Sequence, residues 1–274
     1  MASGLKHLKS HIKAVGNIQK VTGSMKMVAA ARFIQAEKSV SVARPIGLCV
    51  RRFYDSFSQS VKQSDWHHFL ATFTSDRGLC GGVHNKVCKK GKQVLKDNPG
   101  NYSFFCIGEK SRSILAFDFP KLVRIVVNGI GHRTPTFQSA SEITLKLINY
   151  TDFYHVVMVY PIFKNMLSFN IQASNLYSYS VIADTEFVMK YEVDRDDFQS
   201  YVEFLIASQV FSALCDTYLV ELSARINAMS SATKNAGKLK KTLMLQYNRV
   251  RQALVTKELM DIIGGASVII KKKK

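Results

Sequence analysis

Proline and glycine are nearly absent from the last quarter of the chain. Between Phe198 and Ile270 there is no proline, and the only glycines are Gly237, Gly264 and Gly265. Proline breaks an α-helix and glycine weakens one, so their scarcity permits a helix of unusual length. At 1.5 Å per residue such a helix would be roughly 110 Å long, far more than a compact domain of this size needs.

Cysteine and histidine patterns exclude several kinds of site. The five cysteines are scattered, with no C-x-x-C pair, which argues against zinc and favours buried, reduced thiols. The chain has no H-E-x-x-H motif and no G-x-S-x-G nucleophile elbow. Cys80 and His84 stand four residues apart, but such a lone pair is more typical of packing than of a nucleophile and its base. We therefore expect no catalytic residue, metal or cofactor.

Membrane and export signals are also missing from the sequence. No apolar run reaches the ~18 residues of a membrane span. The N-terminus lacks the continuous apolar stretch of a signal peptide. We expect a chain that does not itself cross a membrane.

A heptad pattern occupies the proline-free stretch. Mostly apolar residues recur there in alternating steps of four and three, the 3.5-residue seam of a coiled coil, with Thr233 and Lys240 as polar interruptions. The seam positions are Leu222, Ile226, Met229, Thr233, Ala236, Lys240, Leu243, Tyr247, Val250 and Leu254.

The same alternation marks the start of the chain. It predicts a helix from about Ser3, a plausible N-cap, that can resume beyond Pro45 towards Gln59. Two long seams at opposite ends favour an antiparallel pair. The alternative is two separate amphipathic helices on one globular core. The N-terminal seam comprises Leu5, Leu8, Ile12, Val15, Gln19, Thr22, Lys26, Ala29, Phe33, Ala36, Val40 and Ala43.

Positive charge is concentrated in these two terminal segments. The formal net charge is +18; residues 1–62 hold 11 Lys and Arg against 2 acidic residues, and residues 196–274 hold 12 against 7. A basic rod requires an anionic partner, whether nucleic acid, an acidic protein surface or anionic lipid.

The middle of the chain alternates strand and helix patterns. This alternation predicts right-handed βαβ units and a mostly parallel sheet. Strands are expected at 67–74, 102–108, 122–128 and 153–163, and helices at 83–96, 110–117 and 137–149. The later segment 169–191 is expected to be further strand, as an antiparallel edge or a hairpin. The predicted domains are 1–62, 63–195 and 196–274.

The glycine-rich turn SDRGLCGG (75–82) follows the first predicted strand. It lacks the G-x-G-x-x-G spacing of dinucleotide sites and the Lys and Ser/Thr of a P-loop. Its glycines more plausibly supply tight backbone geometry or a partner contact.

Four segments resemble the gamma subunit of the F-type rotary ATP synthase. They are IQKVTGSMKMVAAAR (18–32), TSDRGLCGG (74–82), ELSARINAMSSATKNAG (221–237), and NRVRQALVTKEL (248–259) with the following DIIGGA (261–266). They occur in the family's order and cover both ends of the chain. GEKSRSIL (108–115) and RTPTFQSAS (133–141) are more like mitochondrial members.

This resemblance implies the fold class: a long antiparallel coiled coil of the N- and C-terminal helices, with a Rossmann-like α/β domain at its foot. It implies a non-catalytic central-stalk rotor that couples proton-driven rotation to conformational change at catalytic sites on the surrounding beta subunits. The implied partners are the alpha and beta subunits of the catalytic hexamer, small rotor subunits of the delta or epsilon type, and the c-ring. Membrane contact would run only through the c-ring, with no nucleic acid.

The resemblance also implies contact residues. Met25 and Lys26, and on the facing helix near the same level Arg251, Gln252 and Thr256, match positions that meet the catalytic subunits. Asp76, Arg77 and Gly78 match the turn where other rotor parts make contact. The implied location is the matrix side of the mitochondrial inner membrane, or alternatively the cytoplasmic side of a bacterial plasma membrane.

The sequence departs from the family pattern in places. Gly16 and Gly23 stand where basic residues are common, and Lys238, Lys240 and Lys241 make one stretch unusually basic. Two other functions stay open from the residues alone. One is a basic coiled coil that binds nucleic acid, with the salt dependence of phosphate neutralisation. The other is a nucleotide-dependent enzyme, which would need a phosphate loop that the chain lacks.

Overall fold

A computed structural model describes residues 2–58, 67–97, 100–150, 154–183, 185 and 194–272. The chain forms two compact units. One comprises Met1–Met27 together with Met229–Lys274, and the other comprises Val28–Ala228. Each unit is described separately.

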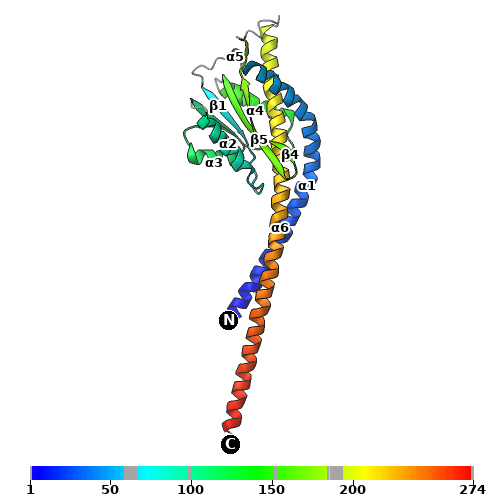
Figure 1. Ribbon diagram of the computed structural model, residues 1–274, viewed down its shortest axis with the longest axis vertical. Helices are drawn as coiled ribbons and strands as arrows, with labels where there is room; N and C mark the ends of the chain where they lie inside the picture. The colour runs from blue at the N-terminus through cyan, green and yellow to red at the C-terminus, as the bar shows by residue number, and fades with distance from the viewer. Residues whose placement is uncertain are drawn as a thin grey trace. The chain divides into compact units, whose positions relative to one another are not determined.

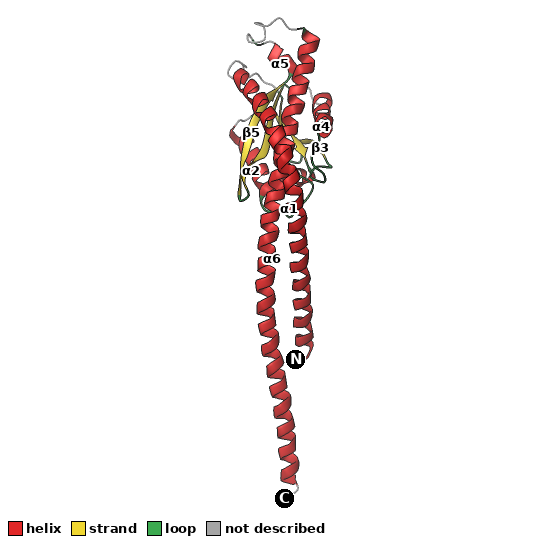
Figure 2. Cartoon of the chain, turned by 90° about the vertical axis from the view of Figure 1, so that its right-hand side faces the viewer, coloured by secondary structure: helices red, strands yellow, loops and turns green. Residues whose placement is uncertain are grey.

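Two long helices, α1 (Ala2–Ser58) and α6 (Arg195–Lys272), run without interruption through both units (Figure 2). Pro45 lies inside α1, where the sequence predicted a break. Asp196 and Asp197 occupy the first turn of α6, and the Asp194 carboxylate accepts a hydrogen bond from the Asp196 backbone N–H at 3.3 Å. Negative charge at this end complements the helix dipole.

The heptad seam is visible in the burial of the first unit, where the starting segment of α1 lies antiparallel to the part of α6 that follows Met229, and the end of α6 continues past it (Figure 1). From Lys238 to Thr256 the only residues that are not fully exposed are Lys240, Leu243, Tyr247, Val250 and Leu254. All five are predicted seam positions, so the coiled coil is confirmed. On α1 every seam position from Leu5 to Ala43 is covered except Lys26, which is exposed.

Polar residues fix the register of this antiparallel pair. The Thr233 hydroxyl donates to the Thr22 hydroxyl across the seam at 2.8 Å. One turn further along α6, Gly237 faces Gln19, and beyond it Lys240 lies against Gly16. Positions on the two helices that lie opposite each other therefore have residue numbers that add up to about 255, which follows from the three contacts in antiparallel geometry.

The second unit contains a five-stranded sheet of order β3-β2-β1-β4-β5 (Figure 1). All neighbouring strands are parallel except β4 and β5, which are antiparallel. The predicted mostly parallel sheet is thus confirmed. The strands are β1 (His68–Phe73), β2 (Tyr102–Ile107), β3 (Val123–Val127), β4 (His155–Asn165) and β5 (Ser168–Tyr177); the helices between and after them are α2 (Val83–Asp97), α3 (Glu109–Asp118), α4 (Phe137–Tyr150) and α5 (Tyr179–Ala183).

One strand prediction was too long. The segment 169–191 was expected to continue as strand, but β5 ends at Tyr177 and α5 follows. Residues 184 and 186–191 of that prediction lie outside the described residues. The three domain boundaries stay a prediction.

Each face of the sheet has its own apolar core. Helices α2 and α3 cover one face, through a cluster that includes Val87, Leu115 and Phe104. On the other face α4 and α5 pack together with parts of α1 and α6, around residues such as Tyr54 and Ile206. Residues 28–58 of α1 and 195–228 of α6 are therefore core elements of the α/β unit.

This burial explains the hydropathy of α6. Among the described residues α6 alone is long and apolar enough to cross a membrane, with an 18-residue window of mean hydropathy 1.3. Of that window 94% is buried within the protein. Its apolar character is that of a core helix, because the sheet and α1 surround it.

Gly47 marks a close approach of α1 and α6 within the α/β unit. A Cβ added at Gly47 would lie 2.2 Å from the Ser212 hydroxyl oxygen and 2.5 Å from the Ser212 Cβ. Both separations are far below van der Waals contact, so only glycine fits at this position without moving the helices.

We predict that Gly47→Ala destabilises the chain by about 1–3 kcal/mol through overpacking. Adding Ser212→Gly removes the clashing atoms and restores part of that stability, less the roughly 1 kcal/mol cost of a helical glycine. Urea denaturation measures both. Gly23→Ala is the matched control, because nothing lies within 4 Å of its added Cβ and it should not destabilise. Equal stability of Gly47→Ala and the unmodified chain would contradict the close approach.

Candidate functional site

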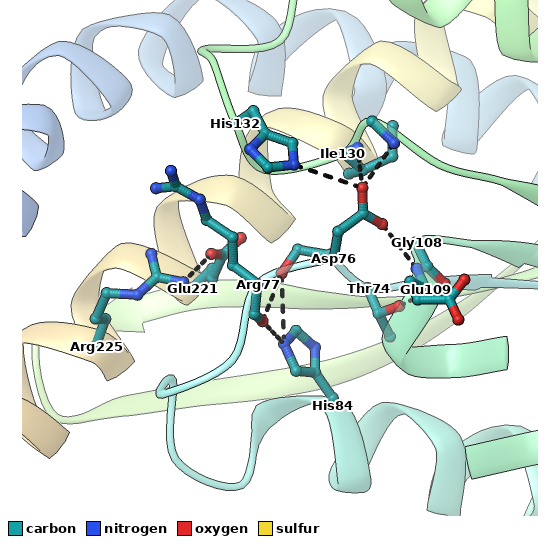
Figure 3. A network of polar contacts seen from close by, with 12 residues as sticks. Thr74, Asp76, Arg77, His84, Gly108, Glu109, Ile130, His132, Glu221 and Arg225 are labelled. Atoms are coloured by element: carbon teal, nitrogen blue, oxygen red, sulfur yellow. Dashed lines mark hydrogen bonds and ion pairs between the residues drawn. The ribbon is translucent and has the colours of Figure 1, made fainter. Parts of the chain in front are cut away.

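The loop between β1 and α2 is held by a dense polar network (Figure 3). The Asp76 carboxylate accepts three backbone hydrogen bonds, from the N–H groups of Glu109 at 2.8 Å, Gly129 at 2.6 Å and Ile130 at 3.1 Å. It thereby ties the loop to the start of α3 and to the segment after β3. The His132 side chain lies 3.8 Å from the same carboxylate.

Arg77 and Gly78 contribute their carbonyl oxygens to this network. The Arg77 carbonyl accepts hydrogen bonds from the His84 ring at 3.1 Å and from the Ser75 hydroxyl at 3.3 Å. The Gly78 carbonyl accepts a hydrogen bond from the Arg225 guanidinium at 3.2 Å. The loop is therefore anchored to helix α2 through His84 and to helix α6 through Arg225.

Two buried residues of α6 complete the network. Glu221 and Arg225 form an ion pair one helical turn apart. Burial raises the pKa of Glu221, while Arg225 acts in the opposite direction. Gly131 lies in the loop between β3 and α4 and has a φ of +89°. A side chain there would come within 2.8 Å of the Glu221 carboxylate, so the β3–α4 loop approaches α6 only because this residue is glycine.

Sequence reasoning did not single out Glu221 and Arg225 as anchors. The available signal was two opposite charges at i, i+4 within an otherwise apolar stretch of helix. Without the neighbouring loop, that spacing is equally typical of an exposed helix pair.

The tip of the loop faces solvent. Gly78, Gly81 and Gly82 are exposed, and Leu79 is 60% exposed with a left-handed φ of 63°. Of the three residues expected to contact other rotor parts, Asp76 is bonded inward, Arg77 is half-buried and Gly78 is open. The structure thus separates a residue that shapes the loop from one that a partner can reach.

The Cys80–His84 pair has the chemistry of packing. The Cys80 sulfur lies 2.9 Å from His84 Nε2, the nitrogen that also bonds the Arg77 carbonyl. In the tautomer with hydrogen on Nε2, that nitrogen donates to the Arg77 carbonyl and cannot take the proton of the thiol. Burial raises the pKa of Cys80 to about 11, so the thiol stays protonated near neutral pH. The expectation of packing agrees with this geometry.

The expected contact residues of the coiled coil lie on its surface. Arg251, Gln252 and Thr256 are exposed along α6, and the Thr256 hydroxyl donates to the Gln252 carbonyl at 3.0 Å. Met25 is 40% exposed and Lys26 is exposed on α1. All five are free of the seam packing that holds the pair.

The expectation that the two groups lie near the same level was wrong. The contacts of Thr22 with Thr233 and of Gly16 with Lys240 place Met25 opposite residues near 230. Arg251 lies about 20 residues further along α6, or roughly 30 Å at 1.5 Å per residue. Sequence matching identified the faces, but only the register of the pair could fix their heights.

Comparison with known proteins gives a consistent result. The model of a family described as ATP synthase matches residues 4–269. The mitochondrial ATP synthase subunit gamma of Drosophila melanogaster is 37% identical, covering 97% of this chain and 90% of that protein. The mitochondrial gamma subunit of Rattus norvegicus is 34% identical, covering 97% and 99%. The ATP synthase gamma chain of Rhodospirillum rubrum is 30% identical, covering 98% and 100%.

Solved structures share the fold. A chain of the Euglena gracilis mitochondrial ATP synthase, from a structure of OSCP, F1 and the c-ring, aligns with a TM-score of 0.79 and 18% identity, covering 100% of this chain and 97% of that one. A chain from the central stalk and c-ring of the Tetrahymena thermophila enzyme aligns with a TM-score of 0.66 and 23% identity, covering 77% and 99%.

We predict that a thiol reagent at near-neutral pH labels Cys49 alone in the folded chain. Cys49 is exposed, whereas Cys80, Cys88, Cys106 and Cys215 are buried, with their pKa values raised by burial. Cys49→Ser should abolish rapid labelling, and all five thiols should react in denaturant. Rapid labelling of Cys80 in the folded Cys49→Ser chain would contradict its assignment as an inert packing residue.

Proposed function

Because the chain belongs to the ATP synthase gamma-subunit family, we propose that it is the central-stalk rotor subunit of the F-type ATP synthase. It is a subunit of that complex, on the matrix side of the mitochondrial inner membrane as in its mitochondrial relatives. Its role is to couple proton-driven rotation to conformational change in the catalytic subunits. Family membership leaves nothing in favour of the nucleic-acid alternative.

The observation that carries this proposal is the charge of the coiled-coil unit. Residues 1–27 and 229–257 contain 12 Lys and Arg and no Asp or Glu. No ion pair between the two helices can form within these segments, because neither contains a carboxylate. The Lys and Arg side chains are therefore available to a partner outside the chain. The charge of this long cationic helix pair is complementary to that of an acidic protein surface surrounding it. We propose that the alpha and beta subunits provide this surface.

We propose that the subunit is non-catalytic. The Cys80–His84 pair supports this, because burial raises the pKa of the Cys80 thiol to about 11 and keeps it protonated near neutral pH. Its action is mechanical. A two-helix coil is asymmetric in cross-section, so each surrounding catalytic subunit meets a different side of it. Contact energies that differ between conformations of those subunits are what coupling requires.

We propose that Arg251, Gln252 and Thr256, together with Met25 and Lys26, contact the catalytic subunits. All five are exposed on the coiled coil. Arginine suits such a contact, because it keeps its charge and presents a planar fork of donors. The roughly 30 Å between the two groups implies that they meet the hexamer at two different heights.

We propose that the tip of the 76–82 loop contacts the small rotor subunits near the c-ring. Asp76 shapes this loop through its three backbone bonds, and the exposed Gly78 offers the surface. Arg77 lies between them, half-buried.

We predict that Arg251→Ala with Gln252→Ala lowers proton-driven ATP synthesis by about tenfold, as expected when a hot-spot contact is truncated. Assembly should be preserved, because neither residue packs in the seam. Synthesis by reconstituted complex and subunit recovery on purification measure the two effects. Arg249→Ala with Gln246→Ala changes the same residue types within the two preceding turns of α6 and is the matched control. Unchanged synthesis in the Arg251 and Gln252 variant would refute the contact.

We predict that Gly78→Trp leaves the stability of the chain within about 0.5 kcal/mol, as for an open surface position. Only Lys110 Cε, at 3.9 Å, lies near an added Cβ. The bulky ring should nevertheless reduce co-purification of the small rotor subunits. Gly78→Ala is the control and should retain them. If Gly78→Trp retains them as well, the loop tip is not the contact.

A further inference from the structure

The guanidinium of Arg44 joins three elements of the α/β unit. Its Nη2 atom, on α1, lies 2.5 Å from the Asp216 carboxylate on α6 and donates to the Phe163 carbonyl on β4 at 3.1 Å. One side chain therefore connects both terminal helices to the sheet. We call these three residues the Arg44 bridge.

The carboxylate of this bridge is deeply buried. The Asp216 side chain is 4% exposed, and the Arg44 side chain is 36% exposed. Burial raises the pKa of Asp216, and its bond to Arg44 counteracts that shift. Bonds between opposite charges in such surroundings are short and directional.

Further polar contacts continue along α6. Two turns before Asp216, the Gln209 amide donates to the Tyr160 hydroxyl on β4 at 3.2 Å. Beyond Asp216, Arg225 bonds the Gly78 carbonyl. These contacts hold one side of α6 to the sheet and its loops, and the Arg44 bridge joins α1, α6 and β4 through a single side chain.

Apolar packing and directional bonds resist different motions of the helices against the sheet. The hydrophobic effect is non-directional, so it opposes separation of α1 and α6 from the sheet more than it opposes their turning or sliding. A hydrogen bond weakens steeply when its angle changes. The bonds of Arg44 to Asp216 and Phe163 therefore fix the angle of both helices against the sheet.

These two helices continue unbroken from the α/β unit into the coiled-coil unit. Any torque that passes between the sheet and the coil must cross the contacts of α1 and α6 with the sheet. We propose that the Arg44 bridge is the joint that transmits torque between the α/β domain and the two helices, with Arg44 and Asp216 as positioning residues. This inference rests on the proposed rotor function and assigns it a specific place in the chain.

The test separates torque transmission from simple stability. Replacing a buried ion pair with apolar side chains of similar volume is often neutral or stabilising, whereas removing one partner is strongly destabilising. Arg44→Met with Asp216→Leu therefore removes the directional bonds and keeps the packing. Thermal denaturation of the purified complex establishes that the variant is folded and assembled.

Two activities are expected to respond differently to the apolar double variant. ATP hydrolysis by the detached catalytic sector drives no load through the joint, so we expect it to stay within about twofold of the unmodified enzyme, since no contact with the catalytic subunits is changed. Proton-driven synthesis by the whole complex does load the joint. At a high ATP to ADP ratio, at which the unmodified enzyme still synthesises ATP, we expect the synthesis rate of the double variant to be about fivefold lower. A loss of this size corresponds to a small decrease in coupling free energy.

Arg44→Lys with native Asp216 provides the second variant. It keeps the charge but loses the planar fork, so synthesis under load should lie between the other two. Equal load dependence in the unmodified enzyme and the apolar double variant would overturn the proposal. Equal losses of hydrolysis and synthesis would also overturn it, because the bridge would then only hold the fold. Failure of the unmodified chain to co-purify with the catalytic subunits would instead refute the proposed function.

Discussion

The pairing of the first and last helices along one seam is the constraint on which the rest of the structure depends. Each helix uses a 3.5-residue repeat, and the two repeats face each other in a register set by Thr22 and Thr233. Polar positions in such a seam cost stability but exclude slipped pairings. The faces that remain exposed, and the heights of their residues, follow from that register.

The charge distribution gives this pair an unusual dependence on its surroundings. Coiled coils commonly use opposite charges beside the seam, yet the paired segments here contain no carboxylate until Glu258. Like charges on both helices repel each other, and salt or an acidic partner relieves that repulsion. The same excess of positive charge that destabilises the isolated helix pair therefore favours its binding to an acidic protein surface.

Within the α/β unit, buried charges mark the places where chain segments meet. Glu221 with Arg225 connects α6 to the loop after β1, and Asp216 with Arg44 connects α6 to α1 and β4. An unpaired charge at these depths would be very costly, so each pair specifies its partner element. Asp76 does the same with backbone N–H groups. These contacts specify how the helices and loops of the unit are oriented against the sheet more strictly than apolar packing alone would.

The two heptad seams, the mostly parallel sheet and the family could all be predicted from the sequence, because periodicity and short motifs are local properties of the chain. The sequence also indicated that Cys80 and His84 are a packing pair. Tertiary structure decided what depends on distant neighbours. Pro45 stays inside α1 and the strand after residue 168 ends at Tyr177. Asp76 faces inward, and Met25 lies far along the coil from Arg251. A residue's spacing predicts its face, but its depth and its partner are set by elements that fold against it from elsewhere in the chain.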